Sequence, residues 1–301
     1  MAQIMPPVAY KEKLTRAGHY LVDKLEARRV PIILPYHFNI LVHEMYKGTA
    51  EEPLYLRRET TEYERYNRLR ENLRESGIIC PDRDYRRAHK ITIAGDLPAD
   101  EVACIADPIC CISYLSAMQR WGLTNRSPKP LFITRPARSN AKNALALIMH
   151  SDGMSETEIP LTNTTHPARV RGRSLSVHER KTEIDYIAIR GTHARATTVP
   201  QTFYDTLHNP EFCGGMNHVI DVWKENARNH VDKIIERMNR DGSAIALCRA
   251  GYILEEIMGV MHPTVDAWAM HAQRGGSRKL DPQKPFVPEF SEKWMISINV
   301  Q

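Results

Sequence analysis

Residues 60–93 hold the residue types and spacings best suited to chemistry, and that chemistry is the binding of phosphate groups. Tyr66, Leu69 and Leu73 recur at the spacing of a single helical face, which predicts an amphipathic helix. At about 100° per residue, a polar and cationic stripe is expected on this helix, turned away from the apolar line. A stripe of this kind suits the major groove of DNA. It consists of Thr61, Arg65, Arg68 and Asn72.

The ends of this helix and the segment after it are also marked in the sequence. Thr61 and Glu64 have the spacing of a capping box, and Gly77 follows the helix as a glycine that ends it. An apolar run from Ile78 turns through charged residues into the alternating stretch 90–93, which predicts a β-hairpin. The cations expected to hold flanking phosphates precede the helix or lie on this hairpin: Arg57, Arg58, Arg83, Arg86, Arg87, His89 and Lys90.

Two further helices are predicted upstream, over residues 10–29 and 35–46, each with apolar residues on one face. Pro31 and Pro35 bracket a short apolar link between them, which can form a small strand or a buried connector. Three helices and a hairpin with a cationic tip predict a winged helix-turn-helix that binds duplex DNA. The alternative for the same residues is a solvated helix face with ordinary ion pairs and a charged hairpin that only aids solubility.

The composition is that of a folded protein. Its net charge is small, so the places where its arginines cluster are more informative about its partners than the total. The chain has 301 residues, of which 42% are hydrophobic and 26% charged, and a formal net charge of +5. No apolar run approaches the roughly 20 residues that span a bilayer, and residues 1–10 lack the apolar core of a signal peptide. The six cysteines have no CxxC spacing, which favours reduced thiols. We therefore expect a cytoplasmic protein without a membrane partner.

The acidic, proline-containing residues 95–107 predict a boundary between two domains, 1–95 and 96–301. The second domain is expected to begin with a helix over residues 113–121 and to continue into a mixed sheet. Its strands are predicted at residues 131–135, 144–150, 173–179 and 184–190. The predicted fold class is α+β, with an N-terminal winged helix-turn-helix domain followed by a mixed α/β domain whose carboxy-terminal third is helical.

No arrangement of residues indicates catalysis, so we expect a protein that is not an enzyme and that has no cofactor, no metal and no catalytic residues. Cys213 and His218 are close in sequence, but a cysteine in a turn that starts a helix usually packs. His37 and His43 are six residues apart and do not share a helical face, and Asp205 has no paired acid. A second candidate basic patch, able to touch phosphate or an acidic partner, consists of Arg274, Arg278 and Lys279.

Two stretches in the later part of the chain carry a likeness to a known family. In residues 106–136 a predicted helix ends in a glycine-leucine pair and leads through a polar turn into a strand. In residues 193–223 a short strand runs into a helix and then a PEFCGG turn at residues 210–215. These stretches resemble AbiEi-type antitoxins. The later runs RAGYILEEIMG and AQRGGSRKLDP extend the resemblance, which covers most of residues 100–290.

The resemblance implies a bacterial, cytoplasmic transcriptional regulator whose winged helix binds inverted repeats in the promoter of its own operon and represses it. It also implies an antitoxin of a type IV toxin-antitoxin system, which opposes a co-encoded nucleotidyltransferase-like toxin without a stable direct complex. The amino-terminal module is longer than the family's compact winged helix. Three alternatives stay open: an orphan regulator of a phage-defence operon, a nucleic-acid-processing enzyme with its core in the middle region, and a protein-interaction module.

Overall fold

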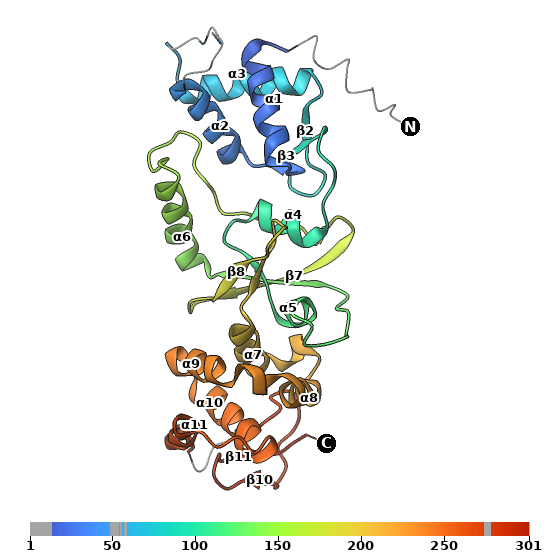
Figure 1. Ribbon diagram of the computed structural model, residues 1–301, viewed down its shortest axis with the longest axis vertical. Coiled ribbons are helices and arrows are strands. Elements are labelled where there is room, and N and C mark those ends of the chain that lie inside the picture. The colour runs from blue at the N-terminus through green and yellow to red at the C-terminus, as the bar shows by residue number, and fades with distance from the viewer. Residues whose placement is uncertain (1–13, 49–53, 55, 57–58, 274–277, 301) are drawn as a thin grey trace. The chain divides into compact units, whose positions relative to one another are not determined.

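The computed structural model describes residues 14–48, 54, 56, 59–273 and 278–300, and it is a mixed α+β protein with two compact units (Figure 1). The first unit comprises Met1–Cys110, Pro136–Leu175 and Gly191–Ala194, and the second unit comprises the other residues. These units differ from the predicted ranges 1–95 and 96–301, because later segments of the chain pack with the first unit. Whether those two ranges are domains that fold independently stays a prediction.

The first part of the first unit consists of three helices and a small antiparallel sheet. The helices gather beside the hairpin of β2 and β3 (Figure 1). In the sheet, β3 lies between the other two strands, in the order β1-β3-β2. The elements are α1 (Arg16–Arg28), β1 (Ile32–Ile33), α2 (Pro35–Lys47), α3 (Glu62–Glu75), β2 (Ile79–Pro81) and β3 (His89–Ile91).

The ends of α3 confirm what the sequence predicts. The Thr61 hydroxyl accepts a hydrogen bond from the backbone N–H of Glu64, and the Glu64 carboxylate accepts one from the backbone N–H of Thr61. This capping box satisfies N–H groups that the first turn leaves without helical partners. Gly77 adopts a φ of 72°, which a glycine reaches without steric cost, and the chain there leaves the helix for β2.

Apolar faces of the three helices form the core of this part. Tyr66, Leu69 and Leu73 are buried, which confirms the predicted apolar line of α3. Leu21 of α1 and Leu41 of α2 are buried in the same cluster. Burial of such side chains contributes roughly 1.5–3 kcal/mol each, and this packing orients α3 relative to its neighbours. The predicted apolar link between α1 and α2 is β1, and both of its isoleucines are buried.

Three more elements lie wholly within the first unit: α4 (Ala99–Ala106), α6 (Arg138–Ser151) and β6 (Arg169–Val170). The strand predicted at residues 144–150 is wrong, because these residues belong to α6. Alanine, leucine and methionine favour a helix, and a short apolar run cannot distinguish a strand from a buried helix. Ala141 and Leu145, four residues apart, are the buried positions of α6.

The second unit contains a mixed sheet in the order β7-β5-β4-β9-β8. Its β4 pairs parallel with β9 and antiparallel with β5, which confirms the predicted mixed sheet. The first residues of β7 belong to the first unit, where Arg173 pairs with Val170 of β6. The strands are β4 (Cys111–Ile112), β5 (Leu131–Pro136), β7 (Arg173–Arg180), β8 (Tyr186–Ala188) and β9 (Arg195–Thr197).

The rest of the second unit is mainly helical, as predicted for the carboxy-terminal third. Its helices α7 to α10 gather around a core that contains Phe203, Trp223 and Trp294 (Figure 1). A π-helical segment, Tyr252–Ile257, directly follows α10. The elements are α5 (Tyr114–Arg120), α7 (Val199–His208), α8 (Met216–Asn226), α9 (Val231–Asp241), α10 (Ala244–Gly251), α11 (Pro263–Ala267), β10 (Phe290–Ser291) and β11 (Ile296–Ser297), with short 3₁₀ turns at Pro210–Cys213, Ala227–His230 and Trp268–His271.

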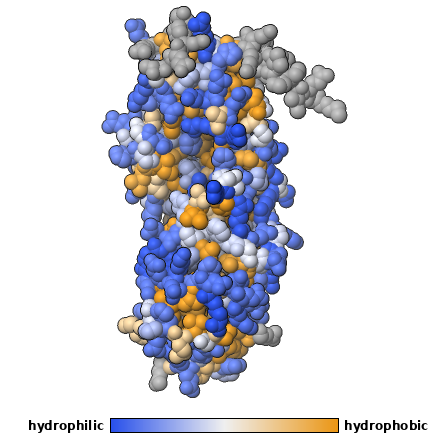
Figure 2. Space-filling model, in the orientation of Figure 1, coloured by the Kyte–Doolittle hydropathy of each residue, from blue (hydrophilic) through white to orange (hydrophobic). Residues whose placement is uncertain are grey.

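Hydrophilic and hydrophobic residues alternate over the visible face of the molecule, as Figure 2 shows. Some large apolar side chains are exposed, such as those of Leu147, Met261 and Met270. Isolated exposed apolar residues are normal on folded proteins. In the described part of the chain, every helix is too short or too polar to cross a membrane.

Candidate nucleic-acid interface

One flank of α3 carries most of the stripe predicted from the sequence, and this flank faces α1 and α2. The Arg65 guanidinium lies 4.6 Å from the ring centre of Tyr46, and its Nε atom donates to the Thr60 hydroxyl at 3.2 Å. Arg68 is exposed and donates to the Tyr46 hydroxyl at 2.8 Å. The aromatic ring therefore holds two arginines in a fixed direction at the end of α2.

Asn72 differs from the rest of the stripe because it takes part in helix packing. Its side-chain oxygen accepts a hydrogen bond from the Thr15 hydroxyl at 3.2 Å, at the N-cap of α1. A Cβ atom at Gly18 would lie 2.7 Å from the same oxygen. Asn72 is half-buried, so its side chain connects α3 to α1 rather than projecting freely from the helix.

The second flank of α3 carries two arginines that the sequence reasoning missed. The Arg70 guanidinium lies 5.4 Å from the ring centre of Tyr66, and Arg74 forms an ion pair with Glu71 at 2.8 Å. Burial, and then the nearby charges of Arg70 and Arg74, lower the pKa of His89 on β3. These arginines therefore lie on the side of α3 that faces the hairpin. Their spacing of four residues, which places both on one helical face, was the signal that could have identified them.

The line of α3 opposite its apolar face is acidic. Counted at about 100° per residue, Glu64, Glu71 and Glu75 lie farthest from the buried leucines. Glu64 is held by the capping box and Glu71 by Arg74. Since carboxylates repel phosphates, a duplex would approach α3 over its Arg65–Arg68 flank rather than over this acidic line.

The hairpin supplies exposed cations at its tip. Arg86 and Arg87 are exposed, and Arg87 also donates from Nη1 to the Thr162 hydroxyl at 2.8 Å. Arg83 is exposed but shares its charge with Asp96 at 3.3 Å and with Asp84 at 3.7 Å. The remaining predicted hairpin contacts, His89 and Lys90, are both half-buried.

A later segment of the first unit contacts the amino-terminal end of α3. The Glu62 carboxylate accepts hydrogen bonds from the Thr157 hydroxyl at 2.7 Å and from the backbone N–H of Glu158 at 2.8 Å. The Glu158 carboxylate in turn accepts one from the backbone N–H of Tyr63 at 2.7 Å. An anion is favoured at this position, because the positive end of the helix dipole and N–H groups without helical partners lie there.

The remaining predicted contacts are distributed differently. Arg57, Arg58 and Arg274 lie outside the described residues. The other members of the second candidate patch are occupied within the fold, because Arg278 donates to the carbonyl of His271 at 2.7 Å. Lys279 donates to the carbonyls of Pro282 and Lys284, at 3.0 and 2.6 Å.

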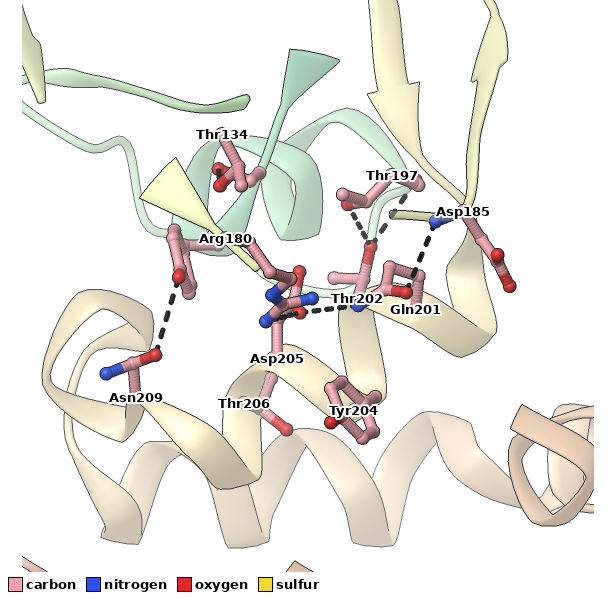
Figure 3. A network of polar contacts seen from close by, with 12 residues as sticks. Thr134, Arg180, Asp185, Thr197, Gln201, Thr202, Tyr204, Asp205, Thr206 and Asn209 are labelled. Carbon is pink, nitrogen blue, oxygen red and sulfur yellow. Dashed lines mark hydrogen bonds and ion pairs between the residues drawn. The ribbon is translucent and has the colours of Figure 1, made fainter. Parts of the chain in front are cut away.

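Asp205 lies at the centre of a buried polar network in the second unit (Figure 3). Arg180 Nη2 lies 2.6 Å from its Oδ1 atom, and the Gln201 amide donates to the same atom at 2.7 Å. The Gln201 side-chain oxygen accepts from Arg237 at 2.7 Å. Burial raises the pKa of Asp205, while the ion pair with Arg180 and the hydrogen bond from Gln201 oppose the rise. The network joins side chains of β7, α7 and α9 and so holds these elements together.

Cys213 and His218, considered above as a nucleophile and its base, have separate surroundings. Cys213 is completely buried, and burial, followed by the charges of Asp205 and Glu211, raises the pKa of its thiol well above the usual value. The Nε2 atom of His218 instead meets the Thr124 hydroxyl at 3.0 Å. A thiol that resists ionisation in an apolar environment is a poor nucleophile, so these two residues do not support the enzymatic alternative.

We expect the protein to lose stability in acid because of His208, at the end of α7. Burial, and then the charges of Arg180 and Arg249, lower its pKa to about 4, and its buried Nε2 atom has no hydrogen-bond partner among the described residues. The His208 imidazole is protonated near pH 6.5 in the unfolded chain but only near pH 4 in the folded chain. The neutral imidazole therefore contributes its full stability above about pH 6.5, and this contribution is lost as the pH falls from 6.5 to 4. We expect this group to account for as much as about 3 kcal/mol of the free energy of unfolding.

The measurement is urea unfolding of the wild type and the His208→Gln variant from about pH 7 to about pH 4. Glutamine does not titrate, so the variant should lose less stability across this range. Identical pH profiles for the two proteins would contradict the assignment to His208.

No protein-family model matches the chain, and no curated protein matches it either. Among solved structures, it is similar to the crystal structure of RV2827C protein from Mycobacterium tuberculosis, with a TM-score of 0.49. The alignment covers 98% of this chain and 95% of that chain, at 12% sequence identity. The contacts of this chain's own residues therefore carry the functional assignment.

Proposed function

We propose that the first unit is a winged helix-turn-helix that binds duplex DNA. The observation that carries the proposal is the order of α1, β1, α2, α3, β2 and β3, together with its arginines. Two arginines of α3 contact Tyr46 of α2, and further arginines are exposed on the β2–β3 hairpin. In this arrangement α3 is the helix that enters the major groove and the hairpin is the wing that follows the phosphate backbone. Arg68 is the residue that we assign to base contact, and Arg86 and Arg87 to phosphate contact.

We further propose that DNA binding serves transcriptional autorepression by an antitoxin of the type IV class, which opposes a co-encoded nucleotidyltransferase-like toxin without a stable complex. The resemblance of residues 100–290 to AbiEi-type antitoxins supports this part of the proposal. An orphan regulator of a defence operon would use the same DNA-binding unit. Co-expression with the product of the neighbouring gene separates the cases, because only an antitoxin relieves growth arrest by that product. Co-purification of the two proteins as a stable complex would contradict the type IV assignment.

Binding to the promoter upstream of the protein's own gene tests the DNA-binding proposal. Fluorescence anisotropy with this duplex and with a scrambled duplex should show tighter binding to the promoter, and affinity should fall as salt rises. The Arg68→Ala variant should lose about 1–3 kcal/mol on the promoter and much less on scrambled DNA. The Arg87→Ala variant should bind both duplexes more weakly and reduce the slope of log K against log salt by about 1.

The matched control is Lys142→Ala, which removes an exposed cation of α6 in the same unit. This variant should bind both duplexes as the wild type does, because α6 lies outside the proposed recognition helix and wing. If Lys142→Ala lost as much DNA affinity as the two arginine variants, binding would depend only on the overall charge of the protein. Binding of the wild type that does not change with salt would contradict phosphate contact altogether.

A further inference from the structure

Three potential metal ligands of the first unit converge, two from one short segment and the third from a distant part of its sequence. Asp107 is the C-cap residue of α4, Cys110 follows three residues later, and His166 lies between α6 and β6. A carboxylate oxygen, the thiol sulfur and an imidazole nitrogen all lie within 4.8 Å of one another. The Asp107 and His166 side chains are 1% and 3% exposed, and Cys110 is completely buried.

The surroundings of His166 match those of a metal-binding histidine. Its Nε2 atom lies 2.9 Å from the Asp107 carboxylate, and its Nδ1 atom lies 3.0 Å from the Tyr85 hydroxyl. Histidines that bind metal through one nitrogen almost always use the other in a hydrogen bond that sets the orientation of the ring. Tyr85 is itself buried and contacts the His166 ring edge to face, so the imidazole is already oriented before any ion arrives.

A second thiol lies close to the same group. Cys104 belongs to α4, three residues before Asp107, so the two share one face of the helix. Cys104 is also buried, so it is a candidate for a fourth ligand.

We propose that Asp107, Cys110 and His166 bind a zinc ion, with Cys104 or a water molecule in the fourth position. Imidazole nitrogen, thiolate sulfur and carboxylate oxygen are the ligands that zinc takes in proteins, at roughly 2.0–2.3 Å and usually in a tetrahedron. Tetrahedral ligands at these bond lengths are roughly 3.5 Å apart, so small side-chain rotations bring the three atoms into place. Cys110 binds as the thiolate and releases its proton to solvent, and the His166 proton moves to Nδ1, where the Tyr85 oxygen accepts it.

A zinc ion here would have a structural role in the first unit. It would join the end of α4 to the segment that contains His166, and the hydrogen bond to Tyr85 would extend this connection to the hairpin. The same segment supplies Glu158 to the start of α3 and Thr162 to Arg87. The site is buried and its ligands come from separate segments, as expected of an ion that stabilises a fold rather than one that meets a substrate.

No metal was expected from the sequence, because its cysteines lack a CxxC spacing and His37 and His43 do not share a helical face. The ligands here are spaced by three residues and then by more than fifty, and a site of this kind becomes visible only when the chain is folded.

Metal content and cobalt substitution of the full, untagged chain test the proposal. Protein expressed with zinc in the medium and then desalted should contain one zinc per chain. Metal-free protein that is given cobalt(II) should develop the intense visible bands of tetrahedral cobalt and a thiolate-to-cobalt charge-transfer band in the near ultraviolet. Zinc should then displace the cobalt and remove both signals. A wild-type protein that contains no zinc and takes up neither ion at stoichiometric concentration would overturn the proposal.

Variants identify the ligands. Cys110→Ser and His166→Gln should each abolish stoichiometric zinc, and Cys110→Ser should weaken or remove the charge-transfer band. The control is Cys213→Ser, which alters a buried thiol of the second unit and should keep the wild-type metal content and spectrum. Circular dichroism tests whether each variant is folded. If a variant is not folded, the cobalt spectrum of the wild type decides whether the protein binds the metal. A charge-transfer band of full intensity in folded Cys110→Ser would count against this site.

Discussion

Replacing Arg171 with asparagine is expected to destabilise the first unit by about 3 kcal/mol, because this one guanidinium contacts three carboxylates, one of which is completely buried. Arg171 contacts Asp82 at 2.9 Å and Asp84 at 2.5 Å, and its Nε atom lies 2.7 Å from Asp96. The Asp82 side chain is completely buried. Removal of the arginine would leave that carboxylate charged and uncompensated, which is the costly way to break a buried ion pair.

The backbone at Arg171 acts in the opposite direction to the lost ion pairs. Arg171 and Gly172 are the two central residues of the turn between β6 and β7, with φ values of 49° and 81°. Two positive φ values in a hairpin turn favour asparagine and glycine, so an arginine there has a steric cost of roughly 1–2 kcal/mol. Arg171→Asn relieves this cost. The net loss of stability is therefore a lower bound on what the carboxylates gain from the guanidinium.

Urea unfolding of Arg171→Asn, compared with Arg169→Asn, measures the effect. Arg169 is exposed on β6, and its replacement should change stability by less than about 0.5 kcal/mol. Adding Asp82→Asn to the Arg171 variant should recover part of the loss, since it removes the unpaired charge. If the Arg171 and Arg169 variants unfold at the same urea concentration, the carboxylate cluster does not depend on Arg171.

The loss of stability in Arg171→Asn is expected to become smaller in acid. Burial acts to raise the pKa of Asp82, but hydrogen bonds from Arg171 and from the backbone of Tyr85 and Asp84 outweigh it, so the pKa is lowered. In the wild type this carboxylate contributes stability above its unfolded pKa of about 4, and the contribution is lost as the pH falls through the folded value. In the variant, protonation relieves an unpaired charge. The stability difference between the two proteins should therefore narrow below about pH 4.

Asp205→Ala is expected to destabilise the second unit by about 3–5 kcal/mol, because it leaves Arg180 buried without its counter-charge. The two side chains meet at 2.6 Å, and the Arg180 side chain is 12% exposed. One further atom of the guanidinium, Nη1, is buried and has no hydrogen-bond partner among the described residues. Arg180 therefore depends strongly on Asp205, and the loss of Gln201's acceptor adds to the cost.

Urea unfolding of Asp205→Ala and of Asp221→Ala separates a structural role from a catalytic one. Asp221 is exposed on α8, so its replacement should be nearly neutral. Combining Asp205→Ala with Arg180→Met should be less destabilising than the sum of the two single changes, because the pair is then absent as a whole. A catalytic Asp205 would predict lost turnover at unchanged stability. Wild-type stability of Asp205→Ala would therefore contradict its place at the centre of the network.

Helix α3 shows how much of the candidate interface could be predicted from sequence. Its capping box, its buried line and its final glycine follow from residues within one or two turns of each other, so the local pattern was sufficient. The flank of the helix that faces Tyr46 was predicted as a free outer stripe. Tyr46 belongs to α2, and no periodicity within α3 indicates which distant aromatic ring its arginines will meet.

Segments that are distant in sequence account for the features that were missed. Thr157, Glu158 and Arg171 lie in a stretch that was assigned to the second domain, whereas their side chains contact α3 and the hairpin of the first unit. Residues 144–150 show a related difficulty, because a run of six apolar residues followed by a histidine is compatible with both a strand and a helix.

The sequence by itself indicated several helices and strands of this protein, and the α+β class that they form, because propensities, caps and apolar periodicity act between near neighbours. Only the tertiary structure decided which charges meet: Arg171 with three aspartates, Asp205 with Arg180, and Asp107 with Cys110 and His166. The physical reason is that a burial pattern specifies which face of an element is covered but not which distant segment covers it.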